Sequence, residues 1–207
     1  MVVETRVYAR SPEECLPYNR PMRLIAPSDY RRMPWKNGGG TTFEVAVHPQ
    51  SADWGSFAWR VSIAEIASSG PFSSFMGIDR MLVVLAGGGM VLTGIREDAV
   101  EIRPYDCVTF AGEAQVASRL LDGPTRDFNV MTRRGAARAD VRVVRSERLA
   151  LDNATTYVCH AASKDCACLV DDATIAVPEA HTLVADVACF AVDATGNGVA
   201  IVATLTQ

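Results

Sequence analysis

The sequence contains only three histidines in 207 residues, and none of them has a second histidine at the spacing of a metal site. His48, His160 and His181 are far apart, and no glutamate follows them at ligand spacing. The His-x-His type of metal site, common in small β-barrels, is therefore missing, although a site assembled from both halves of the chain stays open. We expect no metal and no other cofactor.

Long apolar runs and dense basic clusters are also missing. No stretch reaches the ~20 apolar residues of a membrane helix, and residues 1–20 lack the apolar core of a secretory signal. The formal net charge is −4, and the Lys and Arg residues form no cluster of the density used to bind phosphate backbones. We therefore expect a cytoplasmic protein with no membrane partner and no direct nucleic-acid partner.

Two common catalytic signatures are absent as well. No Gly-x-Ser-x-Gly nucleophile motif occurs, and the glycines at 38–40 lack the spacing of a phosphate-binding loop and precede a strand. The six cysteines are scattered, which favours reduced thiols over a disulfide framework. Cys166 and Cys168 share one face of an expected strand, and we interpret them as core residues in preference to metal ligands.

Alternating apolar and polar residues predict an all-β fold. The clearest alternation covers residues 57–66, and residues 80–86 form a second strong strand. Short strands separated by Gly and Pro continue to about residue 134. From residue 136 the chain becomes rich in Ala, Val, Thr and Asp and shows a second set of short strands. We expect an N-terminal extension over 1–19 and two antiparallel β-barrels over 20–135 and 136–207, with Gly135 at the boundary.

Charged and polar residues occupy strand positions next to large apolar neighbours. Glu44, Arg60, Arg80, Asp127 and Asn129 follow this pattern. They can face solvent, or they can face a cavity, where a buried guanidinium must be paired or must bind an anion. For Arg60, the small neighbours Ala58 and Ser62 on its own face leave room for a ligand.

The segment 35–44, WKNGGGTTFE, combines a Trp-Lys-Asn triplet with three glycines and then a strand. It reads either as a simple glycine turn or as a loop that presents polar groups to a pocket. The segment resembles the W-[KR]-N-G-x-G-x-T-x-E signature of the HutD/Ves family. Three further blocks match that family in order: 57–64 (FAWRVSIA), 70–80 (GPFSSFMGIDR) and 127–133 (DFNVMTR).

The resemblance implies a bicupin fold, with two cupin-like antiparallel barrels of jelly-roll type, and a cupin without metal-binding histidines. It also implies an accessory or regulatory protein of histidine utilisation. Its ligand would be a small carboxylate of the urocanate or the formylated or formiminated glutamate type, bound in the first barrel. Arg60 would anchor the carboxylate through its planar fork. By position, the ligand-binding residues would be Trp35, Lys36, Asn37, Gly38, Glu44, Arg60, Ser62, Arg80 and Asn129.

Three functional classes stay open. The first is a metal-free binding protein that senses or buffers a metabolite. The second is a metal-independent isomerase or hydrolase with Glu44 as general base, or an enzyme with a metal held between the barrels. The third is a structural oligomerisation module, with a homodimer as the assembly to test; this reading leaves the polar residues unexplained. The missing nucleophile and metal motifs favour the binding protein over the enzyme.

Overall fold

The computed structural model describes residues 21–152 and 154–207, and it consists of antiparallel β-sheets. The expected extension over residues 1–19, including Cys15, lies outside the described residues. One 3-10 turn, η2, covers Pro27–Asp29. The strands are β1 Met22–Ile25, β2 Arg31–Pro34, β3 Gly40–His48, β4 Trp59–Ile66, β5 Gly70–Pro71, β6 Ile78–Ala86, β7 Met90–Thr93, β8 Val100–Ile102, β9 Cys107–Ala111, β10 Ala117–Leu120, β11 Thr125–Arg133, β12 Arg138–Arg145, β13 Arg148–Leu151, β14 Thr156–Ser163, β15 Cys166–Val170, β16 Ala173–Val177, β17 Thr182–Ala185, β18 Phe190–Asp193 and β19 Val199–Thr206.

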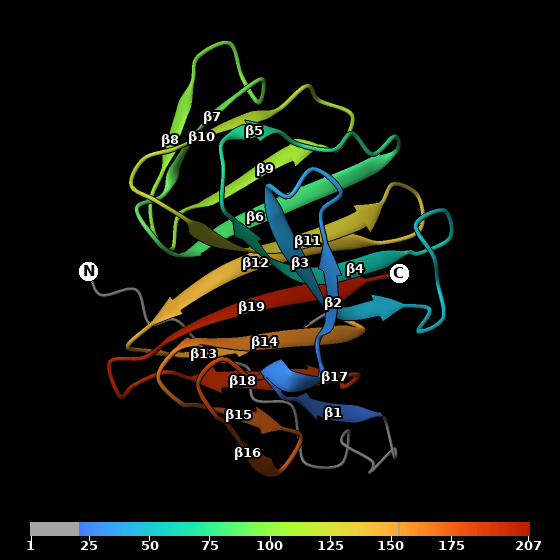
Figure 1. The fold of residues 1–207 in the computed structure, drawn as a ribbon. Helices are drawn as coiled ribbons and strands as arrows, with labels where there is room; N and C mark the ends of the chain where they lie inside the picture. The colour runs from blue at the N-terminus through green and yellow to red at the C-terminus, as the bar shows by residue number, and fades with distance from the viewer. Residues whose placement is uncertain (1–20, 153) are drawn as a thin grey trace, which may run out of the picture.

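The sheets form two lobes, one above the other in Figure 1. The first lobe has a six-stranded sheet in the order β2-β3-β4-β11-β6-β9 and a four-stranded sheet in the order β5-β10-β7-β8. The second lobe has a five-stranded sheet, β1-β17-β14-β19-β12, and a four-stranded sheet, β13-β18-β15-β16. The predicted all-β class is confirmed, with separate sheets in each lobe where the sequence suggested closed barrels.

Three large apolar cores hold these sheets together, beside a small fourth cluster of Phe57, Ile78 and Met131. One lies inside the first lobe and includes Leu82 and Met90, and a second lies inside the second lobe and includes Tyr157 and Val192. The third joins the large sheets of the two lobes. There Val61, Ile63 and Phe128 belong to one cluster with Val158 and Ile201, all fully buried. The large sheet of the first lobe therefore packs on both faces.

Because side chains alternate along a strand, β4 and β11 each contribute residues both to the core between the lobes and to the inside of the first lobe. On β4, Trp59, Val61 and Ile63 pack in the core between the lobes, so the intervening residues face the inside of the first lobe. On β11, Phe128 and Val130 pack between the lobes in the same way. Polar residues at the alternate positions are therefore directed into the first lobe.

Several short elements differ from the sequence expectation. Strand β1 lies within the range expected for the first barrel, but it pairs with β17 of the second lobe, Met22 opposite Ala185. Strands β1, β2 and β13 each lie at the edge of a sheet, and their brevity and charge hide the alternation. In the turn at 27–29 the N-cap position is Ala26, and no side chain caps it.

The connection between β11 and β12 passes from the first lobe to the second. Gly135 lies in this connection with a φ of 82°, a conformation that glycine adopts without steric cost. Across residues 21–152 and 154–207, no helix is long and apolar enough to cross a membrane.

Candidate functional site

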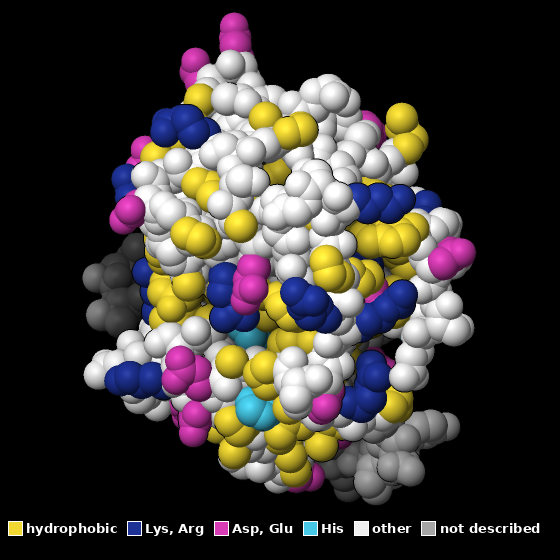
Figure 2. Space-filling view, in the orientation of Figure 1, with side chains coloured by type: hydrophobic (Ala, Val, Ile, Leu, Met, Phe, Trp, Pro, Cys, Tyr) yellow, Lys and Arg dark blue, Asp and Glu magenta, His cyan; other side chains and the backbone are white. Residues whose placement is uncertain are grey.

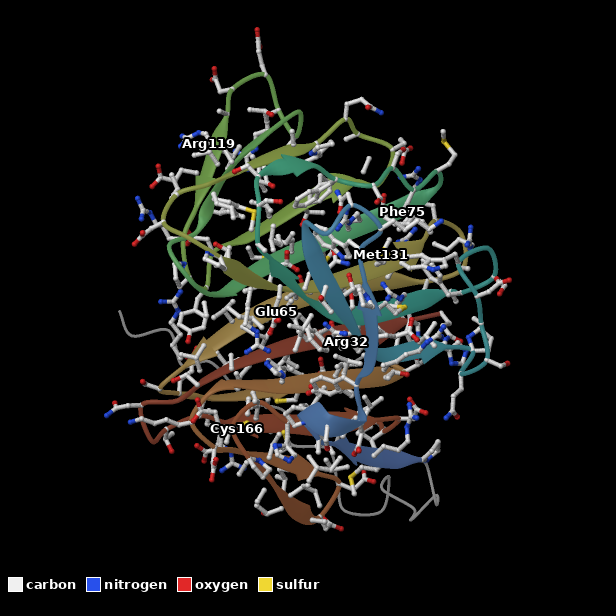
Figure 3. The ribbon with its side chains drawn as sticks, viewed as in Figure 1. Arg32, Glu65, Phe75, Arg119, Met131 and Cys166 are labelled. Atoms are coloured by element: carbon white, nitrogen blue, oxygen red, sulfur yellow. The ribbon has the colours of Figure 1, made fainter. Side chains whose placement is uncertain are left out.

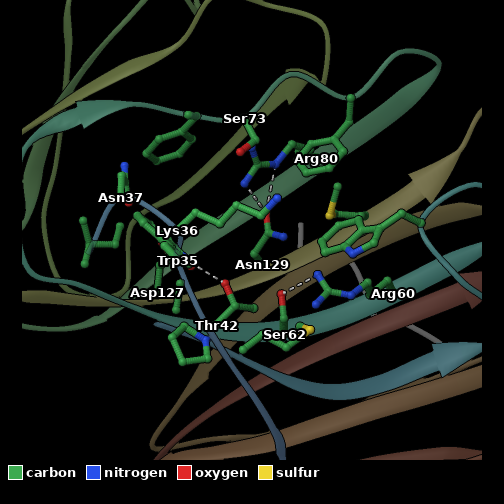
Figure 4. Close-up of a pocket in the computed structure, with 18 of the residues that line it drawn as sticks. Trp35, Lys36, Asn37, Thr42, Arg60, Ser62, Ser73, Arg80, Asp127 and Asn129 are labelled. Atoms are coloured by element: carbon green, nitrogen blue, oxygen red, sulfur yellow. Dashed lines mark hydrogen bonds between the residues drawn. The ribbon is translucent and has the colours of Figure 1, made fainter. Parts of the chain in front are cut away.

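A cavity of about 620 Å³ opens in the first lobe (Figure 4). Its floor is the inner face of the six-stranded sheet, which contributes Arg60 from β4, Arg80 from β6 and Met131 from β11. The loop between β2 and β3 and the segment around Phe72 form its walls. The cavity lining is therefore assembled from separate segments between Met33 and Met131.

The glycine loop shapes one wall of this cavity. Gly38 has a φ of 71°, which glycine adopts without strain. A Cβ atom on Gly40 would lie 2.4 Å from the backbone oxygen of Glu65 and 3.1 Å from the ring of Trp35. Gly40 is thus needed for the close approach of the loop to β4. The loop closes through a hydrogen bond from the Trp35 amide to the Gly40 carbonyl, 3.0 Å.

The polar side chains of the loop have defined partners. Trp35 Nε1 donates a hydrogen bond to Thr42 Oγ1 at 2.8 Å, which fixes the indole at the cavity wall. Asn37 Oδ1 accepts the amide of Gly39 at 3.0 Å, a local turn that leaves its side-chain nitrogen out of this contact. Lys36 also lines the cavity.

Arg60 is buried, with 3% of its surface exposed. Its Nε donates to Glu44 Oε2 at 2.7 Å, and Nη1 donates to Ser62 Oγ at 3.4 Å. The guanidinium lies 4.3 Å from the ring centroid of Trp54, a cation–π contact. Its Nη2 is buried without a hydrogen-bond partner in the described chain. Burial lowers the pKa of Arg60, and the hydrogen bond and charge of Glu44 oppose this shift.

Arg80 is also buried, and its partner is neutral. Nε and Nη2 both donate to Asn129 Oδ1, at 3.2 and 3.1 Å. Its guanidinium lies within cation–π distance of three rings, those of Phe72, Phe75 and Phe110. Burial lowers the pKa of Arg80 to about 10, against the opposing charge of Asp127. No ion pair to Arg80 occurs among the described residues.

Asp127 lines the same cavity. The strand pattern singled it out as a charged residue that can face a cavity, but it was not among the expected ligand-binding residues. Only 2% of its surface is exposed, and its Oδ1 has no hydrogen-bond partner in the part of the chain described. Burial raises the pKa of this carboxyl to about 7, while the charge of Arg80 acts in the opposite direction. Near neutral pH, Asp127 is therefore a mixture of acid and carboxylate.

Most residues chosen from the sequence meet in the cavity. Trp35, Lys36, Asn37, Arg60, Ser62, Arg80 and Asn129 line it. Gly38 belongs to the loop but is not part of the lining. Glu44 lines a neighbouring cavity of about 200 Å³ together with Asp53 and Arg60, and its other oxygen lies 3.6 Å from Arg31. Glu44 thus supports Arg60 from outside the main cavity.

Sequence reasoning missed several aromatic residues of the site. Trp54, Phe72 and Phe75 line the cavity from loops, where no alternation of apolar and polar residues marks the direction of a side chain. Trp54 and Phe75 stack with their centroids 5.2 Å apart, so the two loops meet above Arg60. The family blocks at 70–80 were the available signal for Phe72 and Phe75.

None of the three histidines lines this cavity, and each has its own contacts. His48 stacks on Trp59, with 5.7 Å between ring centroids. His160 is buried, stacks on Phe128 and has its Nδ1 3.0 Å from Thr182 Oγ1. His181 Nδ1 lies 3.1 Å from the Glu179 carbonyl oxygen.

On the face shown in Figure 2, Lys and Arg side chains lie in small groups with Asp and Glu among them.

Comparison with known proteins places the chain in a family. The family model described as HutD matches residues 27–202. An uncharacterized 21.2 kDa protein in the hutC 3' region of Pseudomonas putida is 44% identical over 110 residues, 53% of this chain and 57% of that protein. Protein Ves of Citrobacter koseri is 40% identical over 119 residues, 56% of this chain and 61% of Ves. The chain thus aligns with less than two thirds of the length of these curated relatives.

Solved structures extend the similarity over most of the chain. HutD from Pseudomonas fluorescens SBW25 superposes with a TM-score of 0.79 at 32% identity, covering 90% of this chain and 99% of that one. A conserved Pseudomonas aeruginosa protein of unknown function superposes with a TM-score of 0.84 at 30% identity, covering 90% and 100%. Protein Ylba from E. coli, 9% identical with a TM-score of 0.67, supports the fold alone. The predicted cupin-like fold is confirmed, and the chain belongs to the HutD family.

Proposed function

We propose that this protein is an accessory or regulatory protein of histidine utilisation that binds a small carboxylate metabolite in the first-lobe cavity. The observation that carries the proposal is the pair of buried guanidinium groups, Arg60 and Arg80, on the cavity floor. A buried charge is costly unless it is paired. Arg60 leaves one nitrogen without a partner, and Arg80 is hydrogen-bonded only to the neutral Asn129.

The balance of charge in the cavity favours an anionic ligand. Glu44 pairs with Arg60 from the neighbouring cavity, so it offsets one of the two guanidinium charges. Asp127 offsets the other only in part, because burial raises its pKa to about 7. A ligand carboxylate completes this compensation, and a guanidinium fork binds a carboxylate through two parallel hydrogen bonds.

The size and lining of the cavity suit a small planar metabolite. About 620 Å³ lies within the ordinary range of small-molecule sites. Trp35, Trp54 and Phe72 supply aromatic surface against which an imidazole or amide plane can stack. Asn37 and Ser73 add neutral polar groups at the wall. These features fit urocanate or a formylated or formiminated glutamate.

Calorimetric titration tests this proposal directly. The panel is urocanate, N-formylglutamate, formiminoglutamate, glutamate and histidine, with histamine as a control that lacks the carboxylate. We expect saturable binding of at least one acid, no binding of histamine, and loss of acid binding in Arg80→Ala. Absence of binding by every acid, or equal binding of histamine, would contradict the proposal.

One observation favours a second candidate function, metal-independent acid–base catalysis. It concerns Asp127, whose Oδ1 is unpartnered in the cavity and whose pKa near 7 suits proton transfer at neutral pH. Glu44 is a weaker general base, because it is held by Arg60 and lies outside the main cavity. The same acids can be followed by NMR after incubation with wild type and Asp127→Asn. Conversion by wild type alone would support catalysis, and no conversion by either would leave the binding role.

A further inference from the structure

The second lobe contains a cluster of three thiols. Cys159 lies on β14 of the five-stranded sheet, and Cys166 and Cys168 lie on β15 of the four-stranded sheet. Each pair of their Sγ atoms lies within 4.8 Å, and none of the three forms a disulfide. Half of the six cysteines in the sequence thus meet at one point of the fold.

The cluster lies in the apolar core of the second lobe. Cys159 and Cys168 have no exposed surface, and Cys166 retains 6%, so it is the member nearest to solvent. Val177, Val192 and Val202 belong to the same core cluster. Among the described residues, no fourth His, Cys, Asp or Glu joins the three sulfur atoms. The donor set is therefore three sulfurs in an apolar shell.

We propose that Cys159, Cys166 and Cys168 form a three-thiol site for one soft, thiophilic ion. A trigonal-planar ion with ion–sulfur distances near the 2.3 Å of Zn–S places its sulfurs about 4.0 Å apart, and a pyramidal ion such as trivalent arsenic places them closer together. The observed sulfur separations allow this geometry with small rotations of the side chains. Figure 3 shows Cys166 in the second lobe, well below Phe75 and Met131 of the first-lobe cavity. The site is therefore separate from the proposed carboxylate pocket.

The donor set selects among the ions that bind sulfur. Thiolates favour soft ions such as Cu(I) over Mg²⁺ or Ca²⁺. Structural Zn²⁺ takes four ligands, and this core supplies three. The net charge of the complex discriminates further among these ions. Three thiolates give a complex of net charge −2 with Cu(I), −1 with a divalent ion and zero with trivalent arsenic. An apolar core disfavours net charge, so the trivalent ion fits this site best.

The reaction with arsenite balances without an oxidant or reductant. Arsenous acid, As(OH)₃, condenses with three thiols to give As(SR)₃ and three water molecules. Three As–O bonds and three S–H bonds break, three As–S bonds form, and arsenic stays trivalent. The product is neutral, as the apolar surroundings require.

Native mass spectrometry of the full chain, with a phosphine reductant, tests the site. Wild type is incubated to equilibrium with arsenite, and separately with Cu(I). We expect an adduct of one arsenic atom minus three hydrogens, the mass change that three thiols on one arsenic give. Cys107→Ala is the matched control, since Cys107 is exposed on β9 of the first lobe. It should form the adduct as wild type does.

The variants and the second ion give the remaining outcomes. Neither Cys168→Ala nor Cys168→Val should form the three-hydrogen adduct, and each should bind arsenite at least tenfold more weakly than wild type. Circular dichroism checks that both variants fold. Binding of Cu(I) without arsenite would keep the three-thiol site and overturn the charge argument. Absence of a one-ion adduct with either ion in folded wild type would overturn the site itself, whatever the variants do.

Discussion

Arg60 on β4 and Arg80 on β6 are both register partners of Met131 on β11. Two strand spacings therefore separate their Cα atoms, about 10 Å. The two guanidinium groups face the same cavity, but each has its own aromatic contacts and its own polar partner. A ligand with one or two carboxylates can thus be held at two independent points.

The first prediction concerns the guanidinium fork. Arg60→Lys and Arg80→Lys should each weaken binding of the acid found by titration nearly as much as the Ala variants, because an ammonium cannot reproduce two parallel hydrogen bonds. Two hydrogen bonds to a charged group amount to about 3 kcal/mol, or about 100-fold in affinity. Calorimetry measures this, with Arg142→Ala as control, since Arg142 lies exposed on β12. Unchanged affinity in folded Arg60→Ala would remove Arg60 from the site.

The second prediction concerns Asp127. Burial raises its pKa from 3.8 to about 7, so between these values the folded state keeps a proton that the unfolded state loses. Its contribution to stability is present at low pH and is lost as pH rises toward 7, at up to about 1.4 kcal/mol per pH unit. Asp127→Asn should lack this loss. Urea unfolding from pH 4 to 8 compares the two, and identical slopes would contradict the burial of an ionisable Asp127.

The third prediction concerns His160, whose shift has the opposite sign. Burial lowers its pKa from 6.5 to about 4, with the charge of Arg126 as a lesser cause. Between these values the unfolded state binds a proton and the folded state does not, so stability falls as pH drops from 6.5 to 4. His160→Gln lacks this loss, so in urea unfolding its stability should rise as pH drops over that range, through the Asp127 carboxyl. Because the Asp127 and His160 slopes oppose each other there, the wild-type curve should be flatter than that of either single variant.

The fourth prediction concerns the glycine loop. Gly40→Ala should destabilise the fold by about 1–3 kcal/mol, the usual cost of overpacking, because the new Cβ meets the Glu65 carbonyl at 2.4 Å. It should also weaken ligand binding, since the Trp35 ring must move. Gly196→Ala is the control, with no atom within 4 Å of its Cβ and an expected change within about 0.5 kcal/mol. Thermal and urea unfolding measure both; equal stabilities would refute the close approach.

Much of the fold could be predicted from sequence because alternation records burial. The segment that became β4 alternates over its eight residues, and its apolar face, with Trp59, Val61 and Ile63, packs between the lobes as the pattern predicts. Edge strands such as β1, Met22–Ile25, could not be predicted, since their burial is low and Met22 and Leu24 remain exposed. The pairing of β1 with β17 also joins residues about 160 positions apart, which no local pattern encodes.

Site residues could be predicted only where a strand fixes the direction in which each side chain points. Trp59 packs between the lobes, so Arg60 must face inward, and this follows from the alternation in β4. Trp54 comes from a loop, and its contact with Arg60 depends on how that loop folds back. Cys159 meets Cys166 and Cys168 across two facing sheets, so their convergence depends on tertiary packing. The ligand-binding role of Arg60 and its neighbours in the first-lobe cavity remains a prediction.

The shared core between the lobes has a consequence for how the protein can diversify. In β4, even-numbered residues such as Arg60 and Ser62 line the cavity, and odd-numbered ones such as Val61 join the lobes. In β11 the parity is reversed, with Asn129 in the cavity and Phe128 between the lobes. The residues that face the cavity and the residues that join the lobes are thus two separate sets that alternate along the same strands. A lineage, or a designer, can exchange one set of residues while the other is inherited unchanged.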